Sequence, residues 1–565
     1  MLLPAPVSVS AATVRLKALR RPRWIAAILV LFFLWLVLPF FAHRRPPPPT
    51  VPFPPPPRTA TANRIRNAFI HAYTGYLTHA FPDDELRPLS LRNHTNLNGW
   101  GLTVFDGLDT MWIMGIPELW DHAVEFIAEH QFPMQPKDFA PFFETNIRYL
   151  GGMLSAYALS GNPLLLEKAD ELGASMLPAL DTPSGLPAFA VNTQSGLTRP
   201  GWTGGTLWAE ALSCQLEYKY LAHLTSNPTY FTKVENIMTM METANLTGPG
   251  LFPTIWDTRT GTSKGRVFSA GAFADSAHEY FLKQYLLTSH SEPRALSLYI
   301  DVAEAIIDHL LYYLPFRDFL YVTDIDLPTM KPSYKFEHLS CFLPGMLMLG
   351  VHTLSDKLTP EQATKHKWAA RGLAKACWLT YADMPSGLGP DEVTMQKEGS
   401  LAWVRAYAEW QQKGGKGDAP GSRETEPEPD PDLRYYKIRK PAFLLRPEAL
   451  ESFYVLWRLG EGDIWKERSW KVFEAIEAVA RTPEAYASVT DVEHPVLDGG
   501  FKLKDEMPSY FLAETLKYLY LMFNDDVEYS FEKWVFNTEA HPLPVFHWSE
   551  AEKLAYNISY DSDRL

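Results

Sequence analysis

The chain has 565 residues and a mass of 64.1 kDa, which is too long for a single small module. Hydrophobic residues make up 46% and charged residues 21%, so most of the chain can bury a core and global disorder is excluded. The net charge is −14, but the first 58 residues hold eight basic and no acidic side chains, so the remainder carries −22. A polyanionic body argues against nucleic-acid binding. Three cysteines exclude a disulfide-stapled miniprotein and a multi-cysteine zinc module.

The N-terminal region predicts a membrane anchor. Residues 24–41 (WIAAILVLFFLWLVLPFF) carry no charge and follow a strongly basic segment. This length reaches the short end of a bilayer span, and the heavier basic flank is expected to stay cytosolic. We therefore expect a cytosolic tail at 1–23, a transmembrane signal anchor at 24–41 and a Pro-rich stem at 42–60. The main alternative is a cleaved signal peptide, whose apolar region would be unusually long.

The body that follows is expected to be luminal and helical. Three Asn-x-Ser/Thr sequons, at Asn93, Asn245 and Asn557, predict glycosylation sites and fit a luminal location. A 3.6-residue apolar period recurs from about 61 to 543, without sustained two-residue alternation. It predicts helices at 149–159, 209–224, 278–287, 303–314, 447–459 and 510–523. About fourteen helices would fit this length, enough for a closed ring of helical hairpins. Segment 413–432 is predicted to be a solvated, low-complexity loop.

Several helices carry carboxylates where an apolar side chain is expected. Glu144 and Arg148 stand four residues apart, which is also the spacing of a surface ion pair. Asp275 and Glu279 repeat the spacing with like charges, so a positive ligand, a hydrogen-bonding substrate or solvent should offset their repulsion.

Two further helices add to this group. Glu448 and Glu451 follow Pro447 in a first helical turn, where acids also stabilise the helix dipole. Glu514 sits in a strongly apolar helix and needs partners if it is buried. Acids on separate helices predict a shared acidic pocket. Paired carboxylates in such a pocket are what glycoside hydrolysis requires.

Ordered motifs from about 64 to 544 resemble a known family. They include FDGLDTMWIMG at 105–115, FETNIR at 143–148, HLSCFLPG at 338–345, LRPE at 445–448, ETLKYLY at 514–520 and FNTEAHPLP at 536–544. Together they are similar to the class I α-1,2-mannosidases of glycoside hydrolase family 47. The resemblance implies an all-α, (αα)7 barrel at 61–545 with a C-terminal tail at 546–565. It also implies calcium-dependent, inverting removal of terminal α-1,2-linked mannose.

The resemblance assigns roles to individual residues. Glu144 matches the proposed general acid, Glu448 the proposed general base and Asp275 the third catalytic carboxylate. Thr538 matches the residue that gives oxygens to Ca²⁺, although spacing alone favours a helix N-cap there. Cys341 and Cys377 match an internal disulfide, which leaves Cys214 as a buried thiol. The polar residues that match the sugar pocket are Arg148, Glu210, His338, Arg446, Glu451 and Glu514.

Four positions depart from the family pattern. Phe273 replaces an arginine found in endoplasmic-reticulum members, which favours broader, Golgi-like trimming. Pro508 replaces a pocket acid and Tyr510 a pocket phenylalanine, so the sugar subsite is expected to be altered. His278 stands where tyrosine is usual.

The leading hypothesis is a type II enzyme of the Golgi or endoplasmic-reticulum membrane that trims high-mannose N-glycans. The oligomeric state is left open. The altered 507–511 segment suggests an alternative, a mannose-binding quality-control factor related to the degradation-enhancing mannosidase-like proteins. A third reading is another helical-barrel glycosidase of the glucoamylase type.

Overall fold

The computed structural model describes residues 52–244, 246, 250–496, 500–524 and 529–558. The expected anchor at 24–41 and the sequon asparagine Asn245 lie outside these residues. Within the described ranges, no helix combines the length and the apolar character needed to cross a bilayer.

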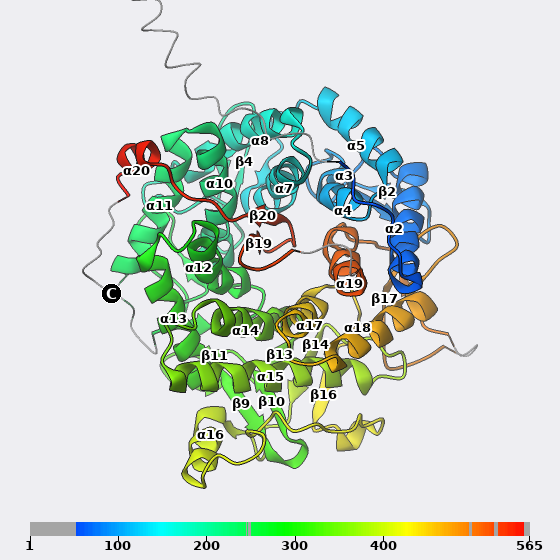
Figure 1. The fold of residues 1–565 in the computed structure, drawn as a ribbon, viewed down its shortest axis with the longest axis vertical. Coiled ribbons are helices and arrows are strands. Elements are labelled where there is room, and N and C mark those ends of the chain that lie inside the picture. Colours follow the sequence, from blue (N-terminus) through cyan, green and yellow to red (C-terminus); the bar gives the residue numbers. More distant parts are fainter. Residues whose placement is uncertain (1–51, 245, 247–249, 497–499, 525–528, 559–565) are drawn as a thin grey trace, which may run out of the picture. The chain divides into compact units, whose positions relative to one another are not determined.

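Inner helices form a closed ring (Figure 1). Each contacts the next in chain order, and the last returns to the first through the π-helical turn η7 (Phe511–Thr515). Their side chains are buried on nearly all faces, as expected for helices enclosed by others. In the described part of the chain the inner helices are α4 (Leu108–Ile113), α7 (Gly151–Ser160), α10 (Gln215–Thr225), α12 (Asp275–Leu287), α14 (Leu343–Thr353), α17 (Glu448–Arg458) and α19 (Leu516–Phe523).

An outer helix packs on each inner helix, which gives the closed ring of helical hairpins expected from the sequence. Five of these outer helices begin with proline, whose missing N–H costs nothing in a first turn. Side chains of Asn162, Asn227 and Thr359 cap three of them. The outer helices are α2 (Ala60–His79), α5 (Pro117–Glu129), α8 (Pro163–Met176), α11 (Pro228–Thr243), α13 (Pro293–His309), α15 (Pro360–Ala382) and α18 (Ile464–Ala475).

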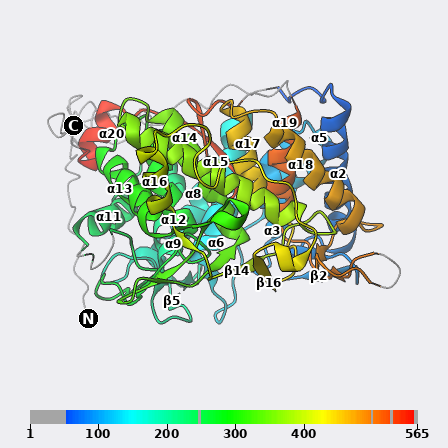
Figure 2. The same cartoon turned by 90° about the horizontal axis from the view of Figure 1, so that it is seen from below.

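Short antiparallel strands connect the hairpins. Figure 2 shows the labelled strands β2, β5, β14 and β16 along one end of the ring. The strands are β1 (Glu85–Arg87), β2 (Arg92–His94), β3 (Ala140–Pro141), β4 (Ala190–Val191), β5 (Thr198–Arg199), β6 (Thr206–Leu207), β7 (Ile255–Trp256), β8 (Val267–Phe268), β9 (Leu311–Leu314), β10 (Phe319–Val322), β11 (Ile325–Asp326), β12 (Lys331–Pro332), β13 (Lys335–Glu337), β14 (Glu392–Met395), β15 (Leu401–Ala402), β16 (Tyr436–Lys440), β17 (Ser488–Val489) and β18 (Leu503–Lys504). The three-stranded sheets have the orders β3-β4-β5, β10-β9-β15, β12-β11-β8 and β13-β14-β16.

A C-terminal hairpin occupies the centre of the ring (Figure 1). Its strands are β19 (Trp534–Phe536) and β20 (Pro542–Pro544), and Trp534 pairs with Pro544. Asn537 fixes the tip, because its Oδ1 accepts the backbone N–H groups of Glu539 and His541, each at 2.8 Å. An added Cβ on Gly151 would lie 2.6 Å from Nδ2 of Asn537, so glycine is what lets α7 approach the tip so closely.

Three expectations need correction. The helix predicted at 303–314 ends at His309, and residues 311–314 form strand β9. The segment predicted as one helix at 209–224 is two, α9 (Trp208–Leu212) and α10. The helix predicted at 149–159 begins instead at Gly151, because residues 149 and 150 belong to the π-helical turn η1 (Thr145–Leu150). A short apolar run such as 311–314 is compatible with either a strand or a helix, which explains why β9 was predicted as the end of a helix.

The loop at 413–432 is more firmly attached than a solvated loop. The backbone N–H groups of Gly421 and Arg423 donate to the Asp318 carboxylate at 3.0 and 2.9 Å. Glu428 N–H donates to Asp383 at 2.7 Å. The segment is thus a mostly exposed loop whose residues 419–421 are buried and which hydrogen bonds attach to the body.

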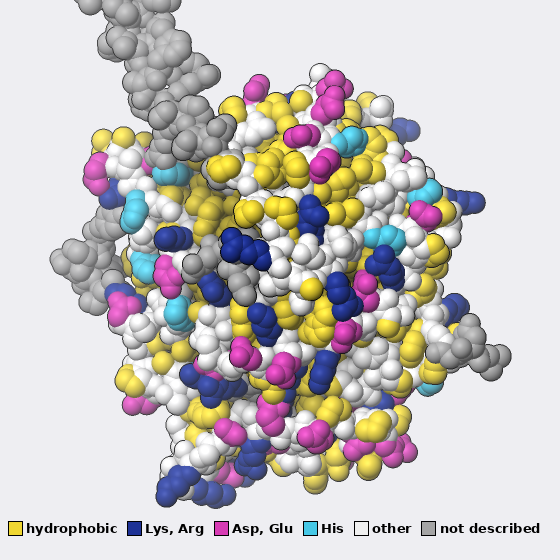
Figure 3. Space-filling view, turned by 45° about the vertical axis from the view of Figure 1, so that its right-hand side comes forward, with side chains coloured by type: hydrophobic (Ala, Val, Ile, Leu, Met, Phe, Trp, Pro, Cys, Tyr) yellow, Lys and Arg dark blue, Asp and Glu magenta, His cyan; other side chains and the backbone are white. Residues whose placement is uncertain are grey.

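The remaining short helices complete the chain. They are α3 (Leu102–Asp106), α6 (Phe142–Glu144), α9, α16 (Trp403–Gln412), α20 (Glu550–Tyr556), η1, η2 (Leu177–Leu180), η3 (Pro315–Arg317), η4 (His338–Phe342), η5 (Pro431–Leu433) and η6 (Ile476–Ala480). On the face shown in Figure 3, acidic and basic side chains are interspersed rather than gathered by sign.

Candidate active site

A cavity of about 210 Å³ lies among the inner helices and the hairpin tip. Carboxylates dominate its polar lining, so negative charge is concentrated in the cavity, whereas on the face shown in Figure 3 acidic and basic side chains are interspersed. The carboxylates are Glu144, Asp275, Glu279, Glu448, Glu451, Glu514 and Glu539. Other lining residues include Arg148, Arg446, Tyr510, Thr538, Phe143, Leu339 and Phe342.

The convergence follows from where these acids stand in their helices. Asp275 is the first residue of α12 and Glu448 the first residue of α17. Both helices belong to the inner ring, and their N-terminal residues line the same cavity. Exposed N–H groups give a helix N-terminus a partial positive charge that favours carboxylates.

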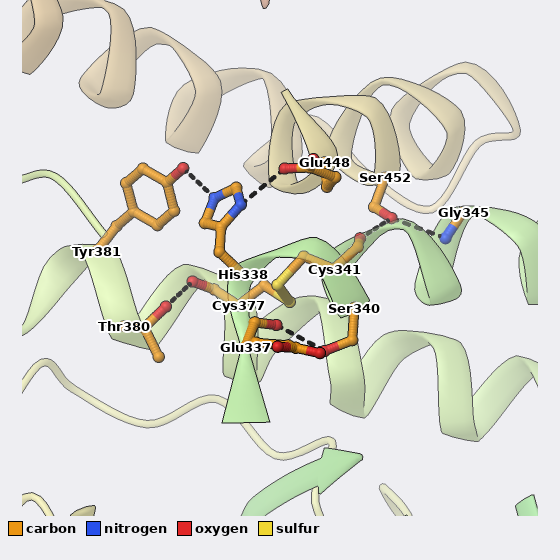
Figure 4. Close-up of a disulfide and its surroundings, with 10 residues drawn as sticks. All are labelled: Glu337, His338, Ser340, Cys341, Gly345, Cys377, Thr380, Tyr381, Glu448 and Ser452. Atoms are coloured by element: carbon orange, nitrogen blue, oxygen red, sulfur yellow. Dashed lines mark hydrogen bonds and ion pairs between the residues drawn. A yellow bond between two sulfur atoms is a disulfide. The ribbon is translucent and has the colours of Figure 1, made fainter. Parts of the chain in front are cut away.

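Glu448 is held by a hydrogen-bonded chain (Figure 4). Nδ1 of His338 donates to Oε2 of Glu448 at 2.8 Å, and Nε2 is hydrogen-bonded to the Tyr381 hydroxyl at 2.5 Å. Burial raises the pKa of the Glu448 carboxyl, but the hydrogen bond and charge of His338 and the charge of Arg446 outweigh it and lower the pKa. Glu448 is therefore kept ionised.

The predicted disulfide stands beside this chain. Cys341 and Cys377 are bonded, which confirms that expectation. Cys341 lies in η4 with His338, and Cys377 lies in α15 with Tyr381 (Figure 4). The bond therefore joins the two segments that carry the partners of this chain.

Asp275 is in the opposite electrostatic state. Burial raises its pKa, as do the charges of Glu279, Glu337 and Glu448, while the Ser276 N–H opposes them; the resulting pKa is about 8. Ser276 N–H donates to Oδ1 of Asp275 at 2.7 Å. Asp275 is thus protonated at neutral pH in the same cavity in which Glu448 is ionised.

Arg148 holds three acids together. Its Nε donates to Glu144 at 2.8 Å, and its Nη1 lies 3.4 Å from Asp106 and in direct contact with Glu539. Burial lowers the pKa of Arg148, but the charges of Glu539, Glu144 and Asp106 raise it well above its usual value. Glu144 and Arg148 do form the ion pair that their spacing suggests. Its arginine is mostly buried and also contacts the buried acids Asp106 and Glu539, whereas the Glu144 side chain is 37% exposed.

Tyr510 lies between two guanidinium groups. Its ring centroid is 5.7 Å from Cζ of Arg148 and 5.9 Å from Cζ of Arg446. Its hydroxyl donates to the carbonyl of Leu444 at 2.8 Å. Arg446 is also bonded to Asp391 at 3.0 Å, so both arginines present fixed donors to the cavity.

Lys283 supplies the positive partner for Glu279. Its Nζ contacts Glu279 directly and lies 3.7 Å from Glu451. The expectation that a ligand or solvent offsets the Asp275–Glu279 repulsion is therefore incomplete, because a lysine one turn further along α12 does so.

Burial and the charges of Glu448 and Glu451 raise the pKa of Glu514 well above its usual value.

Three predicted pocket residues lie around the cavity rather than among the residues that line it. His338 stands behind Glu448. Glu210 accepts from the Leu207 N–H at 3.3 Å, and burial raises its pKa to about 7. In the chain, Phe273 stands between the lining residues Ala272 and Asp275, and its side chain is half-exposed.

The other predicted sites are dispersed. Asn93 is exposed in β2, where its amide is bonded to Asp83, and Asn557 is exposed at the end of α20. Cys214 is a buried free thiol, as expected. His278 is buried, and its Nε2 is hydrogen-bonded to the carbonyl of Ser269 at 2.9 Å.

Residues around the hairpin tip were missed as site residues. Glu539 lines the cavity, and His541 lies behind it with Nδ1 2.9 Å from Asp109 and Nε2 3.3 Å from Asp106. Lys517 pairs with Asp109 at 2.9 Å. Glu539 and His541 belong to the TEAHP motif at 538–542, so the sequence could have indicated them. Only the fold shows that His541 contacts Asp106 of α3 and Asp109 of α4.

The tip also presents oxygen ligands. Within the described ranges, no group of three or more His, Cys, Asp or Glu side chains is arranged to hold a metal ion. Thr538 lines the cavity beside Glu539, and its N–H lies 3.4 Å from the Tyr280 hydroxyl. Thr538 offers hydroxyl and carbonyl oxygens, which are among the donors that Ca²⁺ prefers.

A helical ring that encloses both an ionised and a protonated carboxyl group provides the general base and general acid that a glycoside hydrolase needs. The comparisons with known proteins agree. The profile of glycosyl hydrolase family 47 matches residues 68–545, and the chain belongs to this family.

Named relatives are similar over most of this chain. It is 33% identical to mannosyl-oligosaccharide alpha-1,2-mannosidase IA of Drosophila melanogaster, covering 85% of this chain and 67% of the relative. It is 35% identical to the endoplasmic reticulum mannosyl-oligosaccharide 1,2-alpha-mannosidase of Rattus norvegicus. The match covers 86% of this chain and 68% of that relative. The solved alpha-1,2-mannosidase from Trichoderma reesei superposes with a TM-score of 0.74 at 29% identity, covering 87% of this chain and all of that one.

Proposed function

We propose that this glycoside hydrolase removes terminal α-1,2-linked mannose from high-mannose N-glycans by a calcium-dependent, inverting mechanism. The observation that carries the proposal is the pairing of ionised Glu448 with protonated Asp275 in one cavity. The names of the relatives support the choice of linkage and sugar.

In the proposed reaction, Glu448 accepts a proton from a water molecule as that water attacks the anomeric carbon. A carboxylic acid on the other side gives its proton to the glycosidic oxygen, the C1–O bond breaks and mannose leaves with inverted configuration. His338 and Arg446 serve this step by keeping Glu448 ionised.

Two carboxyl groups are candidates for the acid. The family resemblance assigns this role to Glu144, whereas Asp275 matches another catalytic carboxylate and has a pKa of about 8 that keeps it protonated. Glu451 also has a pKa of about 8, but the resemblance places it among the sugar-binding residues. α-Mannosyl fluoride separates the candidates, because fluoride leaves without protonation. The variant of the true acid, Glu144→Gln or Asp275→Asn, should keep fluoride hydrolysis and lose hydrolysis of the mannoside.

The terminal mannose would be held by the polar and aromatic groups around it. Arg148, Arg446, Glu451, Glu514 and Tyr510 line the cavity and are proposed to bind its hydroxyl groups. Glu210, His338 and Phe273 lie just outside and are proposed to orient these groups or the next sugar.

Thr538 is proposed to hold Ca²⁺ through its hydroxyl and carbonyl oxygens, with waters and sugar hydroxyls completing the shell. When bound, the ion would orient sugar hydroxyls and offset the negative charge of the cavity. Thr538→Ala should raise the Ca²⁺ concentration needed for activity, and Thr538→Ser should raise it less. Equal Ca²⁺ requirements in the two variants and the wild type would contradict this assignment.

The location follows from the N-terminal sequence. We propose a type II protein of the Golgi or endoplasmic-reticulum membrane, anchored by 24–41, with its body in the lumen. The disulfide supports an oxidising compartment. Protease treatment of intact microsomes should spare the body, and glycosidase treatment should increase its gel mobility if the sequons are used.

Incubation of the purified full-length chain with a Man9 oligosaccharide tests the activity. Mannose should be released with Ca²⁺, lost with EDTA and absent in Glu448→Gln. Binding of the oligosaccharide without turnover would instead support the quality-control alternative. Neither binding nor turnover would exclude both.

A further inference from the structure

The last part of the predicted Pro-rich stem lies on the helical body. The ring centroid of Phe53 is 4.0 Å from that of Trp112 and 6.0 Å from that of Trp120. The two indole rings are 4.9 Å apart, and these tryptophans are only 6% and 4% exposed. Phe53 itself is half-buried. A stem residue therefore helps to cover two aromatic side chains of the body.

The backbone of the stem also contacts the body, at the turn after α4. An added Cβ on Gly115 would lie 2.6 Å from the Pro54 carbonyl oxygen, so only glycine allows this approach. Arg66 of α2 fixes the turn, because its guanidinium donates to the carbonyls of Met114 and Gly115, each at 2.9 Å. We call Trp112, Trp120 and Gly115 the stem site.

A second attachment follows a few residues later. Pro57 is buried, and its carbonyl accepts the Asn63 side-chain amide at 2.8 Å. The Thr59 hydroxyl donates to the Phe523 carbonyl at 3.0 Å. Between the two attachments, Pro55 and Pro56 are exposed. The segment is thus held at both of its ends.

The stem is attached at a distance from the cavity. Phe523 is the last residue of α19, whereas Glu514, which lines the cavity, stands nine residues earlier on the same stretch of helical turns. At about 1.5 Å per residue, roughly 13 Å of helix separates the two positions. Loss of the stem contacts should therefore leave the chemistry of the cavity unchanged.

The chemistry of the site suits a proline-rich segment. Four consecutive prolines, 54–57, follow Phe53, and such runs favour the extended polyproline conformation before they bind. Little conformational entropy is then lost on docking, and aromatic-lined surfaces are the usual partners of such segments.

We propose that the stem site binds the chain's own residues 53–57 and thereby protects the Arg58–Thr59 bond from proteases that cut after basic residues. Cleavage at this bond would separate the body from the N-terminal anchor. Protection does not depend on the proposed hydrolysis, whereas retention on the membrane rests on the proposed anchor at 24–41.

The test is the rate at which trypsin cuts the folded full-length chain after Arg58, measured by mass spectrometry of the fragment that begins at Thr59. Phe53→Ala should raise this rate about tenfold, because the fraction of chains with a detached stem sets the rate of cutting. Phe53→Leu, which keeps an apolar side chain, should raise it less.

Variants of both surfaces serve as controls. Trp120→Leu should raise the cutting rate from the body side, and combining it with Phe53→Ala should add little, because both changes remove the same contact. Pro55→Ala is the matched control, since Pro55 lies in the same segment with an exposed side chain. It should cut at the rate of the wild type.

The outcomes are separate from those of the proposed function. Phe53→Ala should hydrolyse α-1,2-mannobiose like the wild type. If the wild type is inactive, an unchanged circular dichroism spectrum shows that the variant is folded, and the cutting rates decide alone. An unchanged rate in Phe53→Ala, or an equal rise in Pro55→Ala, would overturn the proposal. Protection that disappears on dilution would also overturn it, because the bound stem would then belong to a second copy.

Discussion

Nδ1 of His338 lies 2.8 Å from Oε2 of Glu448, and the two residues are 110 positions apart in the chain. This contact joins η4 to the start of α17 and helps to keep Glu448 ionised. Removing the ring should therefore change the pH dependence of catalysis.

His338→Ala should move the acid limb of the kcat/KM profile to higher pH. Glu448 has a lowered pKa because of His338, and it must be ionised to accept a proton from water. Without the ring the pKa rises, so activity is lost at a higher pH as the solution is acidified. His338→Gln can still donate one hydrogen bond and should restore part of the shift. An acid limb that stays in place in His338→Ala would show that another group controls it.

Asp275 should set the alkaline limb. Its pKa is about 8, so if Asp275 rather than Glu144 is the acid, activity should fall as pH rises through about 8. In that case Asp275→Asn should abolish hydrolysis of the mannoside and leave hydrolysis of α-mannosyl fluoride without this alkaline limb. A limb near pH 8 that persists in the variant would assign it to a different group.

The pair Lys517 and Asp109 should be important for stability. Both side chains are fully buried, with Nζ 2.9 Å from Oδ1, and Lys517 also donates to the Ala540 carbonyl at 2.7 Å. Lys517→Met leaves a buried carboxylate short of a partner, which typically costs about 3–5 kcal/mol. Urea unfolding measures this free energy, and the double variant with Asp109→Leu should recover part of it. A loss below about 1 kcal/mol would contradict the importance of this pair.

The disulfide should contribute both stability and position. It closes a separation of 36 residues, so replacing Cys341 and Cys377 by serine should lower the free energy of unfolding by about 3–4 kcal/mol. The acid limb should also move to higher pH, because η4 and α15 carry His338 and Tyr381. Cys214→Ala is the matched control and should leave the pH profile unchanged. A double variant as stable as the wild type would contradict the expectation.

Apolar periodicity predicted segments of five inner helices and of one outer helix, α13. The strand at 311–314 was not predicted, since Leu-Tyr-Tyr-Leu is apolar on both faces and its partners lie in β10 and β15. Pairing of Glu279 with Lys283 could have been found from their four-residue spacing.

The electrostatic roles could not be predicted in this way. Glu448 and Asp275 are both acids at the first position of an inner helix, so local sequence does not distinguish them. His338 and Arg446 lower one pKa, whereas burial and three neighbouring acids raise the other. Arg446 and Glu279 are close in sequence to the acids they affect. His338 and Glu337, and Glu448 relative to Asp275, come from distant segments that only the closed ring brings together.

The central claim is that Glu448 activates water in an inverting hydrolysis of α-1,2-linked mannose. Proton NMR during digestion of α-1,2-mannobiose by the full-length chain with Ca²⁺ tests it most directly. The account predicts that β-mannose appears first and that Glu448→Gln releases none. Initial release of α-mannose, or undiminished release by Glu448→Gln, would contradict it.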